Sequence, residues 1–392
     1  MPALDFKEQK GQKIKKFTII LTITRLCNLK CRYCYENKPI PPPYFMSLKT
    51  AKEVLKENLN SEGLKKKGYS HIEIQFFGGE PFLAFETIKR IVEWVKSQSW
   101  KMKYVFFIGT NGTILTEEMK GWLKKNKEIV KVGFSLDGTR EAHNINRDNS
   151  YDDLRKNMSF FLTHWPHQPA KMTITAETIP YLAESVIELE RMGINFTANL
   201  VFEDIWGEGE KRKSLLKELE NQLERLVDFY KEHPELYPPY PLLNSFPEYL
   251  AFSKKEKMHR FCGAGHGMIA VDTDGKIYPC HRFVPWISGK KPPPSFKEAN
   301  FQTRWLPEKC VNCILLPSCP TCVGFNWEVN KNPEIRTTYH CEAFKLQVLA
   351  SAKLEAFRIN EKIKKMEKLS EEEKVNLSKK LKVIRRLIED GI

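Results

Sequence analysis

Short apolar runs alternate with longer amphipathic runs along the first half of the chain, up to about residue 205. Six of the short runs have the length and composition of strands, namely Phe17–Thr24, His71–Phe77, Tyr104–Gly109, Lys131–Leu136, Lys171–Thr178 and Asn195–Val201. Helical patterns lie between them, including Ser47–Leu59, Ala84–Ser97, Thr116–Lys125, Asp152–Phe161 and Tyr181–Met192. Strands that alternate with helices form parallel sheets. We therefore expect an α/β fold of the partial (β/α)6 barrel type, whose site lies at the C-terminal ends of the strands.

The pattern changes after residue 205. A strongly helical segment, Lys211–Glu232, is followed by YPPYP at Tyr237–Pro241, which breaks the chain. A helical tail starts near Phe344, and Ser370 with Glu373 forms a capping box for a last helix. The apolar stripe of this tail comprises Leu346, Leu349, Leu354 and Phe357. We divide the chain into a barrel at 1–205, a helical linker at 206–255, a cysteine-rich module at 256–345 and a C-terminal helical tail at 346–392.

Composition narrows the class of protein. The chain has 392 residues, of which 41% are hydrophobic, enough for a sizeable core. Its N-terminus is polar and basic without an apolar signal core, and no apolar run reaches membrane-spanning length. We therefore expect a cytoplasmic protein with no membrane partner. Ten cysteines in that compartment point to metal ligands rather than disulfides.

The net charge of +14 invites a nucleic-acid interpretation. The lysines are, however, spread along the chain and mixed with glutamates, which is typical of solvated helix faces. No zinc-finger, RNA-binding or basic-zipper pattern accompanies them. A nucleic-acid partner is therefore not favoured, and the same basic surface would equally attract an acidic peptide or protein.

Three cysteines, Cys27, Cys31 and Cys34, follow the first predicted strand in the sequence CNLKCRYC. Three thiolates hold three irons of a [4Fe–4S] cluster and leave the fourth iron open to a small molecule. The alternatives are a zinc knuckle or buried thiols. A structural zinc site needs four ligands, and no His or fourth Cys lies nearby.

This triad, with Tyr33 before its last cysteine, resembles the signature of the radical S-adenosylmethionine (radical SAM) superfamily. The resemblance implies that the amino and carboxylate groups of SAM chelate the open iron. An electron from the cluster then cleaves SAM to a 5′-deoxyadenosyl radical, which abstracts hydrogen from an unactivated C–H bond. In such enzymes the cofactor carries the hard chemistry, and the protein orients and shields it.

Further segments at predicted strand ends resemble the SAM-binding motifs of this superfamily. Gly78, Gly79, Glu80 and Pro81 would by themselves be an ordinary strand-to-helix turn. Beside the triad they resemble the GGEP motif, which contacts the amino group of the methionine moiety.

The later segments TNG and SLDG resemble motifs of the branch that contains peptide maturases and anaerobic sulfatase-maturating enzymes. The residues concerned are Thr110, Asn111, Ser135 and Asp137. The resemblance places Ser135 and Asp137 near the ribose and pairs Arg147 with the SAM carboxylate, a role that suits its planar fork. Leu200 is expected either to contact the adenine or to pack in the core. His143 either supports a residue that contacts SAM or is an ordinary loop histidine, and the second interpretation is favoured.

The other seven cysteines lie in the last third of the chain: Cys262, Cys280, Cys310, Cys313, Cys319, Cys322 and Cys341. Their array resembles the SPASM domain, which carries two auxiliary [4Fe–4S] clusters, although the spacing from Cys319 to Cys322 is one residue shorter than usual. The alternative is a pair of zinc ribbons.

The SPASM resemblance implies a division of these cysteines. Cys262, Cys280 and Cys322 would hold the first auxiliary cluster, with an open iron or a ligand such as His266. The second set would be Cys310, Cys313, Cys319 and Cys341. The IAVDTDGKIYPC segment between Cys262 and Cys280 reads as a hairpin with its turn at Asp274-Gly275, and we interpret Asp272 and Asp274 as turn residues.

One residue bears on the reaction. Sulfatase-maturating enzymes carry an Asp after the YPC cysteine, where this chain has His281. A His can also take a proton, and second-sphere hydrogen bonding to the cluster is the alternative role. The leading interpretation is a radical SAM/SPASM peptide maturase that forms a crosslink, thioether or oxidised product.

Such an enzyme would use three [4Fe–4S] clusters and SAM. Its partners would be a peptide or protein substrate and a reductant such as flavodoxin or ferredoxin. A separate leader-peptide-binding protein is left open. The alternatives are an anaerobic sulfatase-maturating enzyme that forms formylglycine and, from another class, a basic non-catalytic metal-cluster protein that binds nucleic acid.

Overall fold

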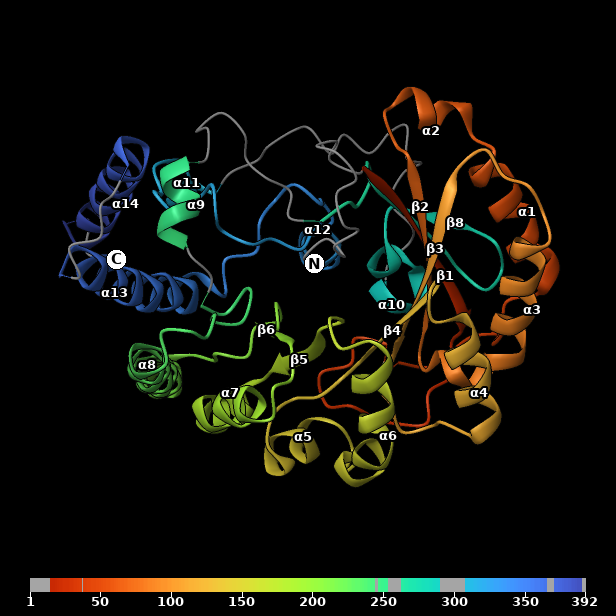
Figure 1. Ribbon diagram of the computed structural model, residues 1–392, viewed down its shortest axis with the longest axis horizontal. Coiled ribbons are helices and arrows are strands. Elements are labelled where there is room, and N and C mark those ends of the chain that lie inside the picture. The colour runs from red at the N-terminus through yellow and green to blue at the C-terminus, as the bar shows by residue number, and fades with distance from the viewer. Residues whose placement is uncertain are drawn as a thin grey trace.

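The computed structural model describes residues 15–36, 38–243, 246–252, 262–289, 307–364 and 370–389. Two parallel sheets organise the first half (Figure 1). The strands are β1 (Lys16–Thr24), β2 (His71–Gly78), β3 (Lys103–Thr110), β4 (Val130–Phe134), β5 (Ala170–Ile174) and β6 (Phe196–Leu200). β1 to β4 are parallel neighbours, and β5 pairs with β6. A bridge between Ser135 and Lys171 joins the two sheets, so the six predicted strands follow one another around a partial barrel.

Helices cover one face of these strands. They are α1 (Leu48–Leu59), α2 (Glu62–Lys66), α3 (Phe85–Lys96), α4 (Glu117–Asn126), α5 (Arg140–Asn146), α6 (Tyr151–His164) and α7 (Leu182–Arg191), with 3-10 turns η1 (Pro81–Ala84) and η2 (Ala176–Tyr181). The side chains of Ser47 and Thr116 cap α1 and α4, as their sequences predict. The fifth predicted strand was too long: it ends at Ile174, because Thr175 and Thr178 form a capping box that starts η2.

Alternation along the strands separates two faces. Every second residue, such as Ile72, Ile74 and Phe76 of β2, packs into the core shared with the helices. The intervening residues form what we call the inner face, opposite the helices. It is unusually polar for a barrel and carries Glu73, Gln75, Lys171, Thr173, Thr197 and Asn199.

A hairpin from the C-terminal half extends the sheet. β7 (Met268–Val271) pairs in parallel with β1, and β8 (Ile277–Tyr278) pairs antiparallel with β7. The predicted turn is confirmed, with Gly275 at φ 87°. The short helices η3 (His281–Phe283), α10 (Pro285–Ser288), α11 (Glu308–Val311) and α12 (Val323–Asn330) follow. The addition of this hairpin to β1 was not foreseen.

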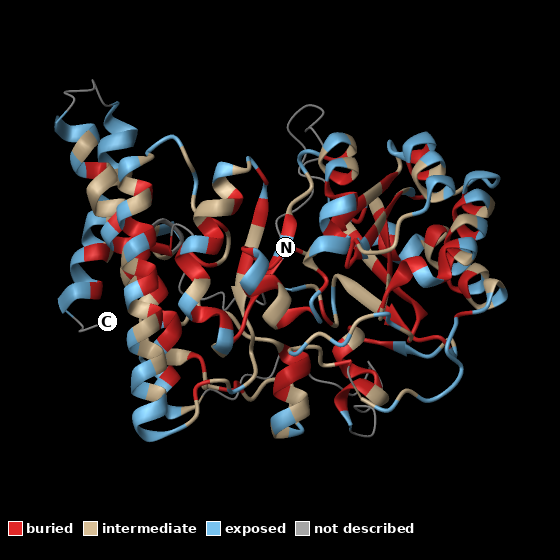
Figure 2. Cartoon of the chain, turned by 90° about the horizontal axis from the view of Figure 1, so that it is seen from below, coloured by how far each residue is buried: buried red, intermediate tan, exposed pale blue. Residues whose placement is uncertain are grey.

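Four helices complete the described chain: α8 (Gly209–Glu232), α9 (Phe246–Phe252), α13 (Cys341–Lys364) and α14 (Glu371–Glu389). The sequence predicts one apolar stripe along α13, whereas the structure buries more than one face of this helix. Its Ala350 and Leu354 join the barrel core together with Leu223 of α8, whereas Phe344 and Val348 pack with α9 and α14. The exposed residues of these long helices accordingly lie on their outward sides (Figure 2).

The last helix begins as predicted. Ser370 and Glu373 form reciprocal hydrogen bonds at the start of α14, which is the geometry of a capping box. Within the described ranges, no helix combines the length and apolarity needed to cross a bilayer.

Candidate functional site

The cysteine triad lies in the loop that follows β1. Desolvation by the surrounding protein raises the pKa of Cys27 to about 11 and that of Cys34 to about 12, and the neighbouring thiol of Cys31 adds to both shifts. The three sulfur atoms therefore lie close enough together for the charge of one thiolate to affect the ionisation of the others. Thiolates so placed need a compensating cation, which is what a bound metal cluster provides.

The two glycines of the GGEP segment hold the start of this loop. The backbone N–H of Gly79 donates to the carbonyl of Thr24 at 3.2 Å, and that of Glu80 donates to the carbonyl of Leu26 at 2.8 Å. Gly78 has φ 133°, and a Cβ placed on it would lie 1.8 Å from the Thr24 oxygen. Glycine is thus required here by contact with the chain that leads to Cys27.

The Glu80 carboxylate is fully buried and has three donors. It accepts from Phe82 N at 2.9 Å, Thr110 Oγ1 at 2.8 Å and Asn111 N at 2.7 Å. Burial raises its pKa, and these hydrogen bonds oppose that rise. Glu80 therefore links the ends of β2 and β3, and its expected contact with a methionine amino group stays a prediction.

The TNG segment also contacts the triad loop. Asn111 Nδ2 donates to Asn28 Oδ1, and Asn28 Nδ2 donates to Thr113 Oγ1, both at 2.9 Å. Asn28 follows Cys27 directly. The first motif cysteine is therefore held from both the β2 end and the β3 end.

A buried ion pair lies at the end of β4. The Nε and Nη2 atoms of Arg147 donate to the two carboxylate oxygens of Asp137 at 2.9 and 3.1 Å. Asp137 also accepts from Asn146 Nδ2 at 3.2 Å and Thr173 N at 2.9 Å. Burial opposes the charge of Arg147, yet Asp137 and Tyr33 hold the pKa of the guanidinium above its usual value.

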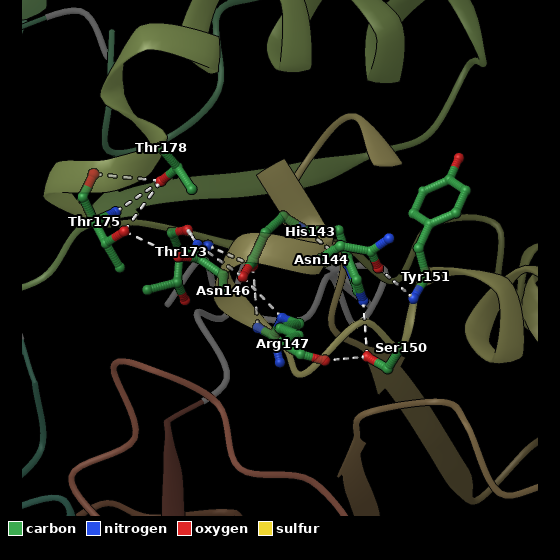
Figure 3. A network of polar contacts seen from close by, with 10 residues as sticks. His143, Asn144, Asn146, Arg147, Ser150, Tyr151, Thr173, Thr175 and Thr178 are labelled. Atoms are coloured by element: carbon green, nitrogen blue, oxygen red, sulfur yellow. Dashed lines mark hydrogen bonds and ion pairs between the residues drawn. The ribbon is translucent and has the colours of Figure 1, made fainter. Parts of the chain in front are cut away.

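The radical SAM resemblance implies that Asp137 and Arg147 contact different parts of SAM, whereas the structure brings them together as a pair. Asn146, which sequence reasoning missed, extends the network to Thr173 and Thr175 (Figure 3). Its carbonyl accepts the N–H of Arg32, and the Arg147 guanidinium lies 5.2 Å from the centre of the Tyr33 ring. The network thereby positions the second half of the triad loop.

His143 is a buried member of this network rather than a loop residue. Its Nδ1 accepts the N–H of Asp137 at 3.3 Å, and its Nε2 lies 3.2 Å from Ser150 Oγ, which donates to the Arg147 carbonyl. Burial, followed by the charge of Arg147, lowers the pKa of His143 to about 4. The ring is therefore neutral and fixes the SLDG turn.

Acid should destabilise the fold through His143. The folded-state pKa lies below the ordinary value of 6.5, so the contribution of the neutral ring is complete above pH 6.5 and is lost as pH falls toward 4. The linked change is roughly 3 kcal/mol. Unfolding of the wild type and His143→Gln, compared between about pH 4 and 7, should show a smaller loss in the variant. An equal loss in both would contradict this role.

The structure also places the other residues that the sequence indicated as ligand contacts. Ser135 directly follows β4, and its N–H donates to the Thr110 carbonyl at 3.1 Å. Leu200 packs against the barrel core at the end of β6, which is the packing alternative stated for it. His266 is exposed, with Nδ1 3.3 Å from the carbonyl of Ala264.

His281 lies against the inner face of the sheet. Its ring centre is 4.4 Å from that of Phe77 at the end of β2 and 5.8 Å from that of Tyr35 in the triad loop. Nδ1 is buried and has no hydrogen-bond partner among the described residues. Burial, then Arg282 and Lys171, lower the pKa of the ring to about 3. The candidate catalytic residue is thus beside the triad loop.

A second buried ion pair fastens the hairpin to the triad loop. Arg25, which directly follows β1, donates from Nε and Nη2 to Asp272 at 3.1 and 2.6 Å. Thr273 Oγ1 donates to the carbonyl of Pro43 at 2.7 Å. Asp272 is therefore a partner for Arg25 as well as a turn residue, whereas Asp274 stays in the turn and pairs with Lys276.

The seven C-terminal cysteines have the neighbours that the SPASM resemblance implies, and their role as cluster ligands stays a prediction. Burial raises the pKa of Cys280, and the nearby thiols of Cys322 and Cys262 raise it further. In the second set, burial and the nearby thiols of Cys341, Cys313 and Cys310 raise the pKa of Cys319. Cys319 Sγ also lies 4.0 Å from His340 Nε2. Among the described residues, no group of three or more Cys, His, Asp or Glu side chains is arranged to hold a single metal ion.

Comparison with known proteins identifies the first half. Residues 21–176 match the model of the radical SAM superfamily. The chain contains a radical SAM domain. The match begins within β1, spans the triad and the GGEP, TNG and SLDG segments, and ends just beyond β5.

Relatives extend the likeness beyond the radical SAM domain. A cysteine-type anaerobic sulfatase-maturating enzyme of Clostridium perfringens is 23% identical over 352 residues, 81% of this chain and 91% of that enzyme. The radical SAM cyclopropyl synthase TigE of Paramaledivibacter caminithermalis is 20% identical over 86% of this chain and 74% of that enzyme.

A solved structure supports the fold. The structure of anSMEcpe with bound AdoMet and Kp18Cys peptide covers 88% of this chain and 99% of that chain, with a TM-score of 0.67 and 20% identity. The α/β fold predicted from the sequence is thus confirmed.

The radical SAM domain implies a [4Fe–4S] cluster and SAM, and the residues fit both. The three grouped thiols supply three iron ligands. The polar inner face beside them offers hydroxyl, amide and ammonium groups to a polar cofactor. Lys171 supplies the ammonium group of this face and was not among the predicted site residues. The signal that could have indicated it is a charged residue inside an otherwise apolar strand.

Proposed function

We propose that this chain is a radical SAM peptide maturase. It would cleave SAM reductively and use the 5′-deoxyadenosyl radical to abstract hydrogen from a peptide residue, giving a crosslink, thioether or oxidised product. The observation that carries the proposal is that the ten cysteines lie near one another as one triad and two C-terminal sets. When bound, the triad cluster supplies the electron that cleaves SAM.

The proposed roles follow the structure. Cys27, Cys31 and Cys34 bind the SAM-site cluster, and Tyr33 and the strand-end segments hold the loop that carries them. Cys262, Cys280 and Cys322 bind one auxiliary cluster, and the remaining four cysteines bind another. His281 is proposed as the proton acceptor, because Nδ1 is unpartnered and the ring lies between Phe77 and Tyr35 at the triad loop. A flavodoxin or ferredoxin is the proposed electron donor.

Two findings support a peptide substrate. The similar solved structure holds a peptide, Kp18Cys, together with AdoMet. A further relative, 24% identical over 67% of this chain, is the antilisterial bacteriocin subtilosin biosynthesis protein AlbA of Bacillus subtilis. Both concern other proteins, and they favour a peptide over a small molecule as the substrate class for this chain.

Replacing Cys27 by Ala should abolish formation of 5′-deoxyadenosine from SAM. The reconstituted wild type should hold about 12 irons and the variant about 8, because one [4Fe–4S] site loses a ligand. Anaerobic reconstitution with iron analysis, EPR and chromatography of the nucleoside products measures both quantities.

Cys262→Ala is the matched control, because it also removes one thiol from a set of three. It should lose a similar amount of iron but still cleave SAM when given dithionite. Undiminished 5′-deoxyadenosine formation by Cys27→Ala would refute the role of the triad.

An anaerobic sulfatase-maturating enzyme is the second candidate, favoured by the relative that covers 81% of this chain. Incubation with a sulfatase-motif peptide decides between the two. Formation of an aldehyde, trapped with a hydrazide and detected by mass spectrometry, supports formylglycine synthesis. Absence of aldehyde in an enzyme that cleaves SAM favours the peptide maturase.

A further inference from the structure

Lys171 presents an ammonium group on the inner face without an ionic partner. Its neighbours on β5, Ala170 and Met172, pack into the core on the other side of the strand. Thr173, which shares the inner face, donates its N–H to Asp137 in the network below the triad loop. Lys171 therefore projects from the inner face, and the thiol of Cys34 is among the groups near enough to affect its pKa.

The charged groups around Lys171 are already paired with one another. Arg147 donates two hydrogen bonds to Asp137, and Arg282 donates to Glu203 at 2.7 Å and Glu328 at 3.1 Å. Among the described residues, no carboxylate lies within ion-pair distance of Lys171, and its side chain keeps access to solvent. Desolvation and then Arg147 lower the pKa of its ammonium group.

The adjacent strand adds two polar side chains. In the β5–β6 register Lys171 faces Thr197, and Thr173 faces Asn199. Thr197 and Asn199 alternate with the core residues Phe196 and Ala198, so they lie on the inner face too. In the part of the chain that is described, neither side chain has a protein hydrogen-bond partner.

We propose that Lys171, with Thr197 and Asn199, forms a carboxylate-binding subsite inside the barrel. The Lys171 ammonium has a positive charge that no described carboxylate neutralises. The Thr197 hydroxyl and the Asn199 amide add neutral hydrogen-bond donors. A carboxylate is the ligand group that this combination of one cation and two neutral donors binds best. The carboxylate belongs either to the amino-acid part of SAM or to an acidic residue or C-terminus of the peptide substrate. This subsite rests on the proposed function, because it needs SAM or a peptide in the barrel.

Binding measurements on the anaerobically reconstituted chain test the subsite and separate the two sources. The first arm compares SAM with decarboxylated SAM by calorimetry. The second arm compares, in the presence of SAM, a defined peptide library containing Asp and Glu with the same library containing Asn and Gln. Each is measured for the wild type, Lys171→Gln, Lys171→Arg and Lys131→Gln. Lys131 is the matched control, since it is a strand lysine that donates to the carbonyl of Lys127.

Loss of the carboxylate contact should weaken binding about 10- to 100-fold. If Lys171→Gln removes the preference for SAM over decarboxylated SAM, the carboxylate is that of the cofactor. If it removes the preference for acidic peptides instead, the carboxylate is that of the substrate. Either result supports the subsite, provided that Lys171→Arg restores the preference and that Lys131→Gln keeps it.

Wild-type selectivity retained in Lys171→Gln in both arms would overturn the inference alone. A change confined to the cluster reduction potential would also overturn it, because Lys171 would then serve only to balance the charge of the cluster. A wild-type chain that binds neither SAM nor acidic peptides would overturn the inference together with the proposed function.

Discussion

Replacing Asp137 by Asn should lower the free energy of unfolding by about 3–5 kcal/mol, the cost of leaving a buried charge without its partner. The carboxylate takes two hydrogen bonds from Arg147, one from Asn146 and one from the backbone of Thr173, and it is fully buried. The side-chain amide of asparagine would instead point an NH2 group at the N–H groups that now donate to Asp137. Denaturant unfolding of the reconstituted chain measures the loss.

The same substitution should also reduce iron at the triad. Arg147 and Asn146 hold Tyr33 and Arg32, so their displacement loosens the segment between Cys31 and Cys34. The EPR signal that responds to added SAM should therefore weaken, whereas the signals of the C-terminal sets should not.

Asp152→Asn provides a matched comparison. Asp152 pairs with Arg140 through both carboxylate oxygens, as Asp137 does with Arg147, but both partners are more than half exposed. Solvent screens such a pair, so its loss should cost less than about 1 kcal/mol. Equal effects of the two substitutions would show that the buried pair has no special importance.

Gly78→Ala should prevent stable folding. The added Cβ would lie 1.8 Å from the carbonyl oxygen of Thr24, and the φ of 133° is one that alanine rarely adopts. Backbone strain and steric overlap cost on the order of 1–3 kcal/mol each. Their sum, about 4 kcal/mol, is a large part of the stability of a domain. Soluble yield and the denaturation midpoint measure the effect.

Gly121→Ala is the control for this change. Gly121 lies within α4, has no atom within 4 Å of an added Cβ and does not have a positive φ. Alanine is favoured over glycine in a helix by about 1 kcal/mol, so the control should be slightly more stable than the wild type. A Gly78→Ala chain as stable as this control would mean that β2 can withdraw from Thr24 without cost.

The sequence predicted the strands well, because strands depend on local signals. Alternating apolar residues define β1 to β4 within one or two residues, whereas the division of the C-terminal cysteines came from the SPASM resemblance and stays a prediction. The end of β5 was missed because Thr175–Thr178 start a 3-10 turn that competes with the strand.

The pairings between segments that are distant in the chain could not be predicted from the sequence. The sequence of Met268–Val271 is equally compatible with a strand that pairs solely with β8 in its own hairpin. Nothing in these residues indicates β1 as a second neighbour. Likewise, Asp137 and Arg147 each looked suited to a ligand, and only the fold shows that they are suited to each other. Lys171 was passed over because a single charge in a strand more often marks a solvated edge.

β1 has neighbours on both sides, with β2 along one edge and β7, some 250 residues later, along the other. A chain cut anywhere between the two halves would leave the main-chain groups of Thr18–Leu21 unsatisfied and open to association with other molecules. The strand that delivers the cysteine triad is therefore completed only after the ribosome has made the hairpin. Until then, one edge of β1 has no partner strand in the nascent chain.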